Sequence, residues 1–118
     1  VKLIGYKENP ESYIKISDVF VLSSIYEGLP NVLIEALYLK KYIISSDCPT
    51  GPKEILNNGR YGDLFKVQDY NQLFKLLKNF NNKSKKIQLK INQGYKSLYR
   101  FDYKNNCKKY FQTISKYY

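Results

Sequence analysis

The chain has 118 residues, 43% hydrophobic and 16% aromatic content, and a formal net charge of +10. This length allows one folded domain and excludes two, and the composition excludes a disordered chain. Histidine is absent and the two cysteines, Cys48 and Cys107, are far apart, which excludes histidine-based catalysis and the common zinc frameworks within the chain. No apolar run is long enough to span a membrane, so we expect a cytoplasmic protein. Because Val1 already lies in an apolar run, we expect a larger parent protein.

The first half alternates short apolar runs with amphipathic stretches, which is typical of a parallel sheet covered by helices. Between the strands we expect a short helix over 9–17, a longer helix from Pro30 to about residue 40, and one or two helical turns within 53–59. The expected strands span residues 1–6, 18–24, 41–47 and 60–67.

From Asp69 onward the pattern is helical. Apolar residues recur every three or four positions, which predicts helices over 69–80, 83–97 and 102–116. The predicted fold is therefore α/β: a partial Rossmann-like domain with a parallel sheet of about four strands flanked by helices, and a helical C-terminal tail over 69–118. We treat residues 1–118 as one domain that includes this tail.

The loop after the second expected strand has the features of a ligand-binding turn. In an open α/β sheet, ligands bind beyond the carboxyl ends of the strands, where helix N-termini present free N–H groups. Gly28 allows a turn or the close approach of a ligand, and Pro30 suits the start of a helix. The N–H groups of Asn31 and Val32 are then available to an anion such as a diphosphate.

Two carboxylates flank this helix start, Glu27 before it and Glu35 about one and a half turns inside it. Carboxylates repel a diphosphate but accept strong hydrogen bonds from sugar hydroxyls. The order of acceptor, donors and acceptor matches a nucleotide sugar, which has a diol at each end and the diphosphate between. Two alternatives stay open: Glu27 as a charge favoured by the helix dipole, and Glu35 as a group with a structural partner.

The segment SIYEGLPNVLIEALYLKKYIISSDCPTGPKEIL resembles the donor-site segment of retaining glycosyltransferases with the GT-B fold, the family four group. That group's signature is two glutamates separated by seven residues, met here by Glu27 and Glu35. A strand ending in Gly5, the run SDVFVLSS and a glycine-bearing loop before Glu54 also match the family pattern. The resemblance covers about residues 1–66, and the tail only in general character. It implies that this chain is half of a GT-B fold.

Carried across, the resemblance implies that Glu27 contacts the transferred sugar, as the candidate catalytic residue, and that Glu35 binds the ribose. The backbone after Glu27 would meet the sugar and diphosphate, and the Gly5–Tyr6 pair would lie near the nucleobase. The candidate donor-binding residues are Gly5, Tyr6, Glu27, Gly28, Leu29, Pro30, Asn31, Val32 and Glu35. The family implies no cofactor and no essential metal, and the chain has no Asp-x-Asp motif to hold one.

The sequence also departs from the family pattern. The separate N-terminal domain that holds the acceptor site in GT-B enzymes is not in this sequence, and neither are the usual basic residues for the leaving diphosphate. Lys40 and Lys41 stand where relatives carry small residues, a change expected to affect a turn. We therefore expect the donor half of a hexosyltransferase, inactive alone, whose parent acts on a glycan or lipid-linked acceptor in polysaccharide, lipopolysaccharide or glycolipid synthesis. The alternative is a non-catalytic remnant, or a subunit completed by a partner chain.

The basic residues are unevenly placed. Residues 1–60 carry seven basic and seven acidic side chains, whereas residues 61–118 carry thirteen and three. A basic C-terminal half suits an anionic membrane surface, which would place the protein at the inner face of the membrane. The alternative is a lysine-rich composition that serves solubility alone. No recognised RNA or DNA motif is present, so we do not expect nucleic acid as a partner.

Overall fold

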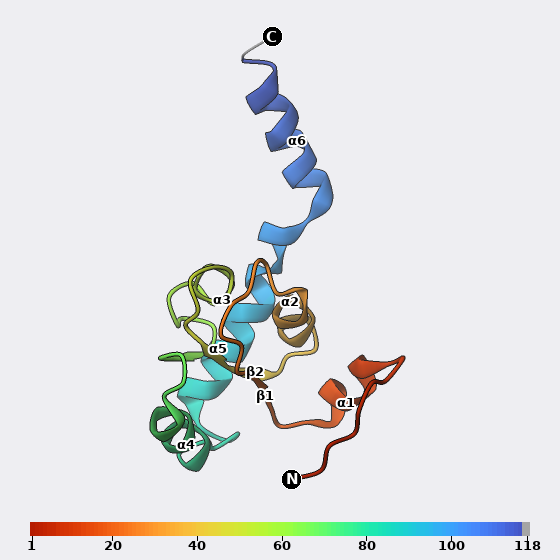
Figure 1. The fold of residues 1–118 in the computed structure, drawn as a ribbon. Helices are drawn as coiled ribbons and strands as arrows, with labels where there is room; N and C mark the ends of the chain where they lie inside the picture. The colour runs from red at the N-terminus through yellow and green to blue at the C-terminus, as the bar shows by residue number, and fades with distance from the viewer. Residues whose placement is uncertain (117–118) are drawn as a thin grey trace.

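The computed structural model describes residues 1–116; Tyr117 and Tyr118, the end of the expected tail, lie outside the described residues. Three strands form a parallel sheet in the order β1-β2-β3, with helices around it (Figure 1). The elements are α1 (Pro10–Ile16), β1 (Val19–Leu22), α2 (Asn31–Tyr38), β2 (Tyr42–Ser46), α3 (Pro52–Ile55), β3 (Asp63–Phe65), α4 (Tyr70–Lys78), α5 (Lys85–Lys96), the 3-10 helix η1 (Ser97–Phe101) and α6 (Tyr103–Ile114). The predicted α/β class with a parallel sheet is confirmed.

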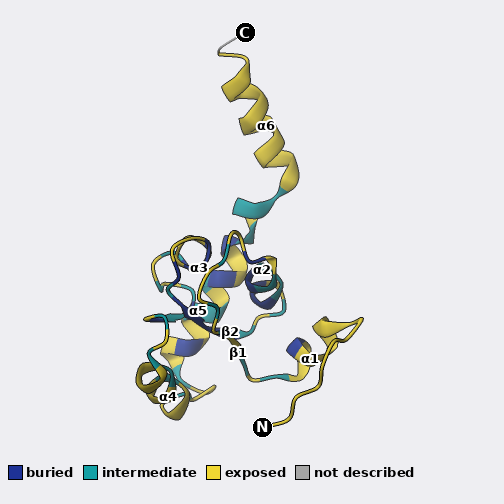
Figure 2. Ribbon diagram, in the orientation of Figure 1, coloured by how far each residue is buried: buried dark blue, intermediate teal, exposed yellow. Residues whose placement is uncertain are grey.

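The central strand β2 is buried along its whole length (Figure 2). It separates two packed clusters of side chains. Successive side chains of a strand point to opposite faces, so Ile43 packs with α2 and α3 while Tyr42 and Ile44 pack against α5. This arrangement explains why the strand is a continuous apolar run: both of its faces are covered. The first cluster contains Ile14, Leu33, Ala36, Leu37, Ile43, Ile55 and Leu56, and the second Tyr42, Ile44, Phe65 and Ile87.

Residues 1–6 do not form the expected strand, and the sheet has three strands where about four were expected. The side chains of Val1, Leu3 and Tyr6 are exposed. A β-strand is held by hydrogen bonds to a neighbouring strand, and no described residue pairs with this segment. An apolar run alone therefore does not produce a strand here.

Helix α2 ends in a turn that requires a left-handed residue. Lys40 has a φ of 54°, its N–H donates to the Leu37 carbonyl at 3.0 Å, and the N–H of Lys41 donates to Ala36 at 2.9 Å. These two bonds satisfy carbonyls at the helix end, in a motif where glycine is favoured. The Lys41 ammonium also donates to the carbonyls of Lys15 and Ser17, at 2.7 and 3.0 Å. The double lysine thus shapes this turn and ties the end of α1 to it.

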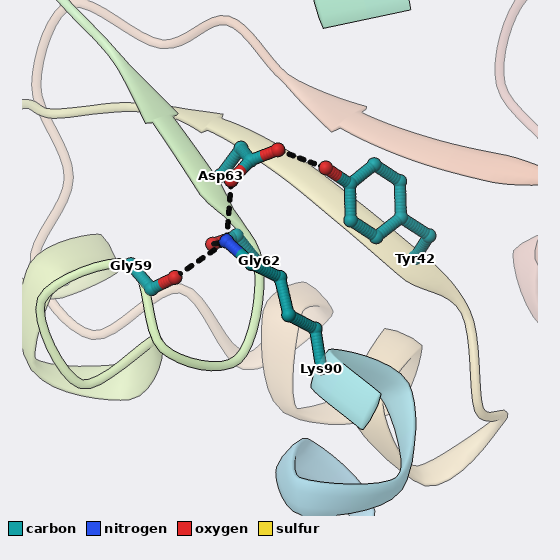
Figure 3. A network of polar contacts seen from close by, with 5 residues as sticks. All are labelled: Tyr42, Gly59, Gly62, Asp63 and Lys90. Atoms are coloured by element: carbon teal, nitrogen blue, oxygen red, sulfur yellow. Dashed lines mark hydrogen bonds and ion pairs between the residues drawn. The ribbon is translucent and has the colours of Figure 1, made fainter. Parts of the chain in front are cut away.

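A polar network fastens α5 to the edge of the sheet (Figure 3). The Lys90 ammonium donates to the carbonyls of Gly59 and Gly62, at 2.8 and 2.9 Å, and forms an ion pair with Asp63. The other Asp63 oxygen accepts a hydrogen bond from the Tyr42 hydroxyl. Burial, together with this contact to a carboxylate, raises the pKa of Tyr42 above its ordinary value, so the phenol stays protonated and donates.

The helical tail forms as expected, with slightly shorter helices. Helices α4 and α6 are capped at their N-termini by Asp69 and Asp102, whose carboxylates accept N–H bonds at 2.8 and 2.9 Å from the first turn. Helix α6 projects from the rest of the chain and is exposed along its length (Figures 1 and 2). Over residues 1–116, no helix has both the length and the apolar character needed to cross a bilayer.

Candidate functional site

Residues 23–30 form a loop that leads from the carboxyl end of β1 to the N-terminus of α2 (Figure 1). Pro30 precedes the first helical residue, Asn31, and its carbonyl accepts the N–H of Leu33 at 2.9 Å. The N–H groups of Asn31 and Val32 make no hydrogen bond to another described residue. The loop therefore ends in two free donors at the positive end of a helix dipole, as expected.

Glu27 is held in this loop by its side chain and its backbone. The Ser24 hydroxyl donates to Oε1 of Glu27 at 2.6 Å, and the Thr50 hydroxyl donates to the Glu27 carbonyl. The carboxylate is partly buried, and its second oxygen has no partner among the described residues. A partly buried carboxylate with one oxygen free can accept a hydrogen bond from a ligand hydroxyl.

A second loop, residues 47–51 after β2, packs against the first. Ser46 is buried, and its hydroxyl donates to the Ser24 carbonyl at 2.6 Å. Gly51 has a φ of 86°, and a Cβ on it would lie 2.5 Å from Cδ of Pro30 and closer still to the Gly28 carbonyl oxygen. The two loops are therefore in direct backbone contact, and this contact needs a glycine at position 51.

Gly28 behaves differently from Gly51. Its φ lies outside the left-handed region, and a Cβ built on it would meet no atom within 4 Å. Neither the backbone conformation nor internal packing therefore requires glycine at this exposed position. Of the two roles that the sequence indicates for Gly28, a turn that requires a left-handed glycine is excluded, while the close approach of a ligand stays a prediction.

Glu35 lies on α2 beside a largely apolar cavity of about 490 Å³. Glu11 of α1 and Asp102 at the start of α6 bring two more carboxylates to the same cavity. An adjoining cavity of about 700 Å³ is lined by Leu29 of the first loop and by Arg100, and it shares Tyr99 and Phe101 with the cavity of Glu35. Glu35 and the first loop therefore border neighbouring cavities, while Glu27 lines neither.

Gly5 and Tyr6 are not brought to this site. They lie in the segment ahead of α1, which runs apart from the loop between β1 and α2 (Figure 1). Tyr6 is 90% exposed and borders none of the cavities described above. Their expected place near a nucleobase stays a prediction.

Sequence reasoning missed four residues that shape the site: Ser24, Thr50, Gly51 and Arg100. The Arg100 guanidinium donates to the carbonyls of Glu54 and Ile55, at 3.3 and 2.8 Å, and so ties η1 to α3 beside the larger cavity. Only the serine, three positions before Glu27, left a local signal in the sequence. The other three act across more than twenty positions, where no spacing rule applies.

No group of three or more metal-ligating side chains is placed to hold an ion within residues 1–116. The expected independence from metals stays a prediction.

Comparison with known proteins identifies the family of the chain. Residues 1–97 match the family model described as Glycosyl transferases group 1. An uncharacterized glycosyltransferase of Methanocaldococcus jannaschii is 55% identical over 56 residues, which are 48% of this chain and 14% of that protein. The N-acetylgalactosamine-N,N'-diacetylbacillosaminyl-diphospho-undecaprenol 4-alpha-N-acetylgalactosaminyltransferase of Campylobacter jejuni is 33% identical over 78 residues, 66% of this chain and 21% of that protein.

Among solved structures, the crystal structure of TarM superposes with a TM-score of 0.78 over 91% of this chain and 22% of that chain. The sequence identity is 18%, so this likeness shows the fold. The chain spans only 14% and 21% of the two curated relatives above.

Proposed function

The chain belongs to the group 1 family of glycosyl transferases and has the fold of the C-terminal half of a GT-B enzyme, and on this premise we propose that it binds a nucleotide diphosphate sugar. The observation that carries the proposal is the first loop. It sets the free oxygen of Glu27 close in sequence to two unpaired N–H groups at the start of α2, with open space at Gly28 between them. Such a loop can hold hydroxyl groups and an anion at neighbouring positions.

Each part of the donor has a counterpart in the site. Glu27 accepts a hydrogen bond from the sugar that is transferred, and the N–H groups of Asn31 and Val32 bind the diphosphate. Glu35 accepts hydrogen bonds from the ribose, because its cavity combines carboxylates with an apolar wall. When the glycosidic bond breaks, the same N–H groups stabilise the charge that develops on the departing diphosphate.

The parent protein would transfer a hexosyl group to a glycan or a lipid-linked acceptor. The Campylobacter relative, whose name specifies a diphospho-undecaprenol acceptor, supports the lipid-linked class. Because the chain spans about a fifth of that relative, we expect it to bind the donor without turning it over. A further domain or a partner chain would supply the acceptor site.

Calorimetric titration of this chain tests the roles of the two glutamates. The ligands are UDP-N-acetylgalactosamine, UDP-galactose and GDP-mannose, each compared with UDP or GDP. We expect Glu27→Gln to lower the affinity for the nucleotide sugars alone. Glu35→Gln should lower the affinity for the nucleotide sugars and for the free nucleotides alike. Each loss should be about 10- to 100-fold, the contribution of a hydrogen bond to a charged group.

Glu8→Gln, at an exposed carboxylate ahead of α1, is the matched control and should leave every affinity unchanged. Absence of heat with all five compounds would contradict the proposal. Equal binding by Glu27→Gln, Glu35→Gln and the unmodified chain would contradict it as well.

We further propose that α6 lies on an anionic membrane surface, which would place the protein at the cytoplasmic face of the membrane. The helix contains no acidic residue, and helical spacing groups its apolar side chains on one stripe with lysines on both flanks. A basic amphipathic helix of this kind binds the boundary between lipid headgroups and acyl chains. The stripe contains Tyr103, Cys107, Tyr110, Phe111 and Ile114, all exposed.

Sedimentation with vesicles tests the membrane proposal. We expect the chain to bind vesicles of phosphatidylcholine with phosphatidylserine, to leave pure phosphatidylcholine unbound, and to dissociate as salt is raised. The double variant Lys108→Gln, Lys109→Gln should bind about 30-fold more weakly, since each lysine contributes about 1 kcal/mol near such a surface and about 1.4 kcal/mol is tenfold in affinity. Lys75→Gln, Lys78→Gln on α4 removes the same charge, and an equal loss there would show that net charge alone is responsible.

A further inference from the structure

The side chain of Glu27 is fixed by a serine on its own loop. The Ser24 hydroxyl lies 2.6 Å from Oε1 of Glu27, a distance typical of a strong hydrogen bond to a carboxylate. A serine hydroxyl has one proton, and here this proton points to Glu27. One carboxylate oxygen is therefore occupied within the protein, and the other is left for a ligand.

Ser24 is itself anchored to the central strand. Its carbonyl accepts the hydroxyl of Ser46, which is 1% exposed and ends β2, at 2.6 Å. Thr50, four residues further along, holds the carbonyl of Glu27. The backbone on both sides of the Ser24–Glu27 contact is thus bonded to the carboxyl end of β2, the most buried strand of the sheet, and to the loop that follows it.

We propose that Ser24 is a positioning residue for Glu27, and that Ser46 holds Ser24 in place from the core of the sheet. The inference rests on the proposed function, in which Glu27 binds the transferred sugar. A free glutamate side chain loses rotamer entropy when it is ordered. The hydrogen bond from Ser24 orders the Glu27 side chain before the donor binds. The carboxylate therefore already has its binding orientation when the sugar arrives.

The first test is spectroscopic and needs no ligand. In the chain labelled with ¹³C at glutamate carboxyl groups, the Glu27 resonance is the one lost in Glu27→Ala. We expect this resonance to shift in Ser24→Ala and to return in Ser24→Thr, which keeps the hydroxyl. Ser23→Ala, at the exposed neighbouring serine, is the matched control and should leave the resonance in place. A resonance unmoved by Ser24→Ala would overturn the inference.

The second test separates positioning from a merely structural role. Ser24→Ala should lower the affinity for UDP-N-acetylgalactosamine, or for whichever nucleotide sugar the unmodified chain binds, by about 3- to 10-fold. The affinity for the free nucleotide should stay unchanged. In the Glu27→Ala background the same substitution should have no further effect, because its target is gone. An equal loss for sugar and nucleotide would show that Ser24 only maintains the loop, and would overturn the proposal.

The two proposals can fail separately. If Glu27→Ala leaves the affinity for every nucleotide sugar unchanged, the proposed role of Glu27 fails, whatever the carboxyl resonance shows. If Glu27→Ala lowers the affinity for the nucleotide sugar, but Ser24→Ala changes neither that affinity nor the carboxyl resonance, the role of Ser24 fails and that of Glu27 stands.

Discussion

Replacing Gly51 with alanine is expected to lower the free energy of unfolding by about 2–4 kcal/mol, whereas Gly28→Ala should change it by less than about 0.5 kcal/mol. At Gly51 the φ of 86° is strained for any residue with a side chain, and the new Cβ would lie 2.5 Å from Cδ of Pro30. The carbonyl of Gly28 is closer still, so the two loops have to move apart. At Gly28 the same methyl group enters open space.

Urea unfolding followed by circular dichroism measures both variants, with the midpoint and the slope compared to the unmodified chain. The two variants, Gly51→Ala and Gly28→Ala, also distinguish an effect on stability from an effect on donor binding. Gly28→Ala should fold normally and lose affinity for a nucleotide sugar, because the methyl group occupies the open space in which the proposed donor binds. Stable Gly51→Ala would show that the two loops are not in backbone contact, and full donor affinity in Gly28→Ala would remove the main observation behind the proposed function.

Replacing Lys90 with methionine should lower the free energy of unfolding by about 2–3 kcal/mol. The Lys90 and Asp63 side chains are only 14% and 26% exposed, so water solvates them poorly. Without the ammonium, the carbonyls of Gly59 and Gly62 lose a donor and Asp63 keeps an uncompensated charge beside Tyr42 (Figure 3). The methionine retains most of the apolar volume, so the loss reports the polar contacts.

Lys86→Met, one turn earlier on the same helix and exposed, is the control for removing a lysine from α5 and should change stability by less than about 0.5 kcal/mol. The loss of unfolding free energy in the double variant Lys90→Met, Asp63→Asn should be about 1–3 kcal/mol smaller than the sum of the losses in the two single variants, since the residues form one network. Additive losses would mean that the ion pair does not couple α5 to the sheet.

Several elements of the fold were predictable because their signals are local. The helix after Pro30 was expected from the position of a proline and from apolar spacing, and it begins at Asn31. The tail helices were expected from the same spacing, and Asp69 and Asp102 cap two of them. The prediction of a strand over residues 1–6 was wrong. The apolar pattern suits a strand, but no described segment pairs with these residues.

The candidate site was predictable in part. The spacing of Glu27 and Glu35 located the loop and α2, and Gly28 was singled out, although its lack of a structural reason emerged only from the geometry. Ser24 stands three positions before Glu27, and a reading of side-chain pairs at that spacing could have found it. Gly51 was recognised only as the glycine of the loop before Glu54, whereas the structure shows it packed against Gly28.

By itself, the sequence determined the α/β class, the order of the helices and strands after residue 9, and the loop that carries Glu27. Periodicity, caps and turn residues act within a few positions, so a single chain displays them directly. Only the tertiary structure decided which apolar run becomes a strand and which side chains hold Glu27 and Asp63 in place. Apart from the Ser24–Glu27 pair, those contacts join residues at least 21 positions apart, as with Tyr42 and Asp63, and the folded sheet is what brings them together.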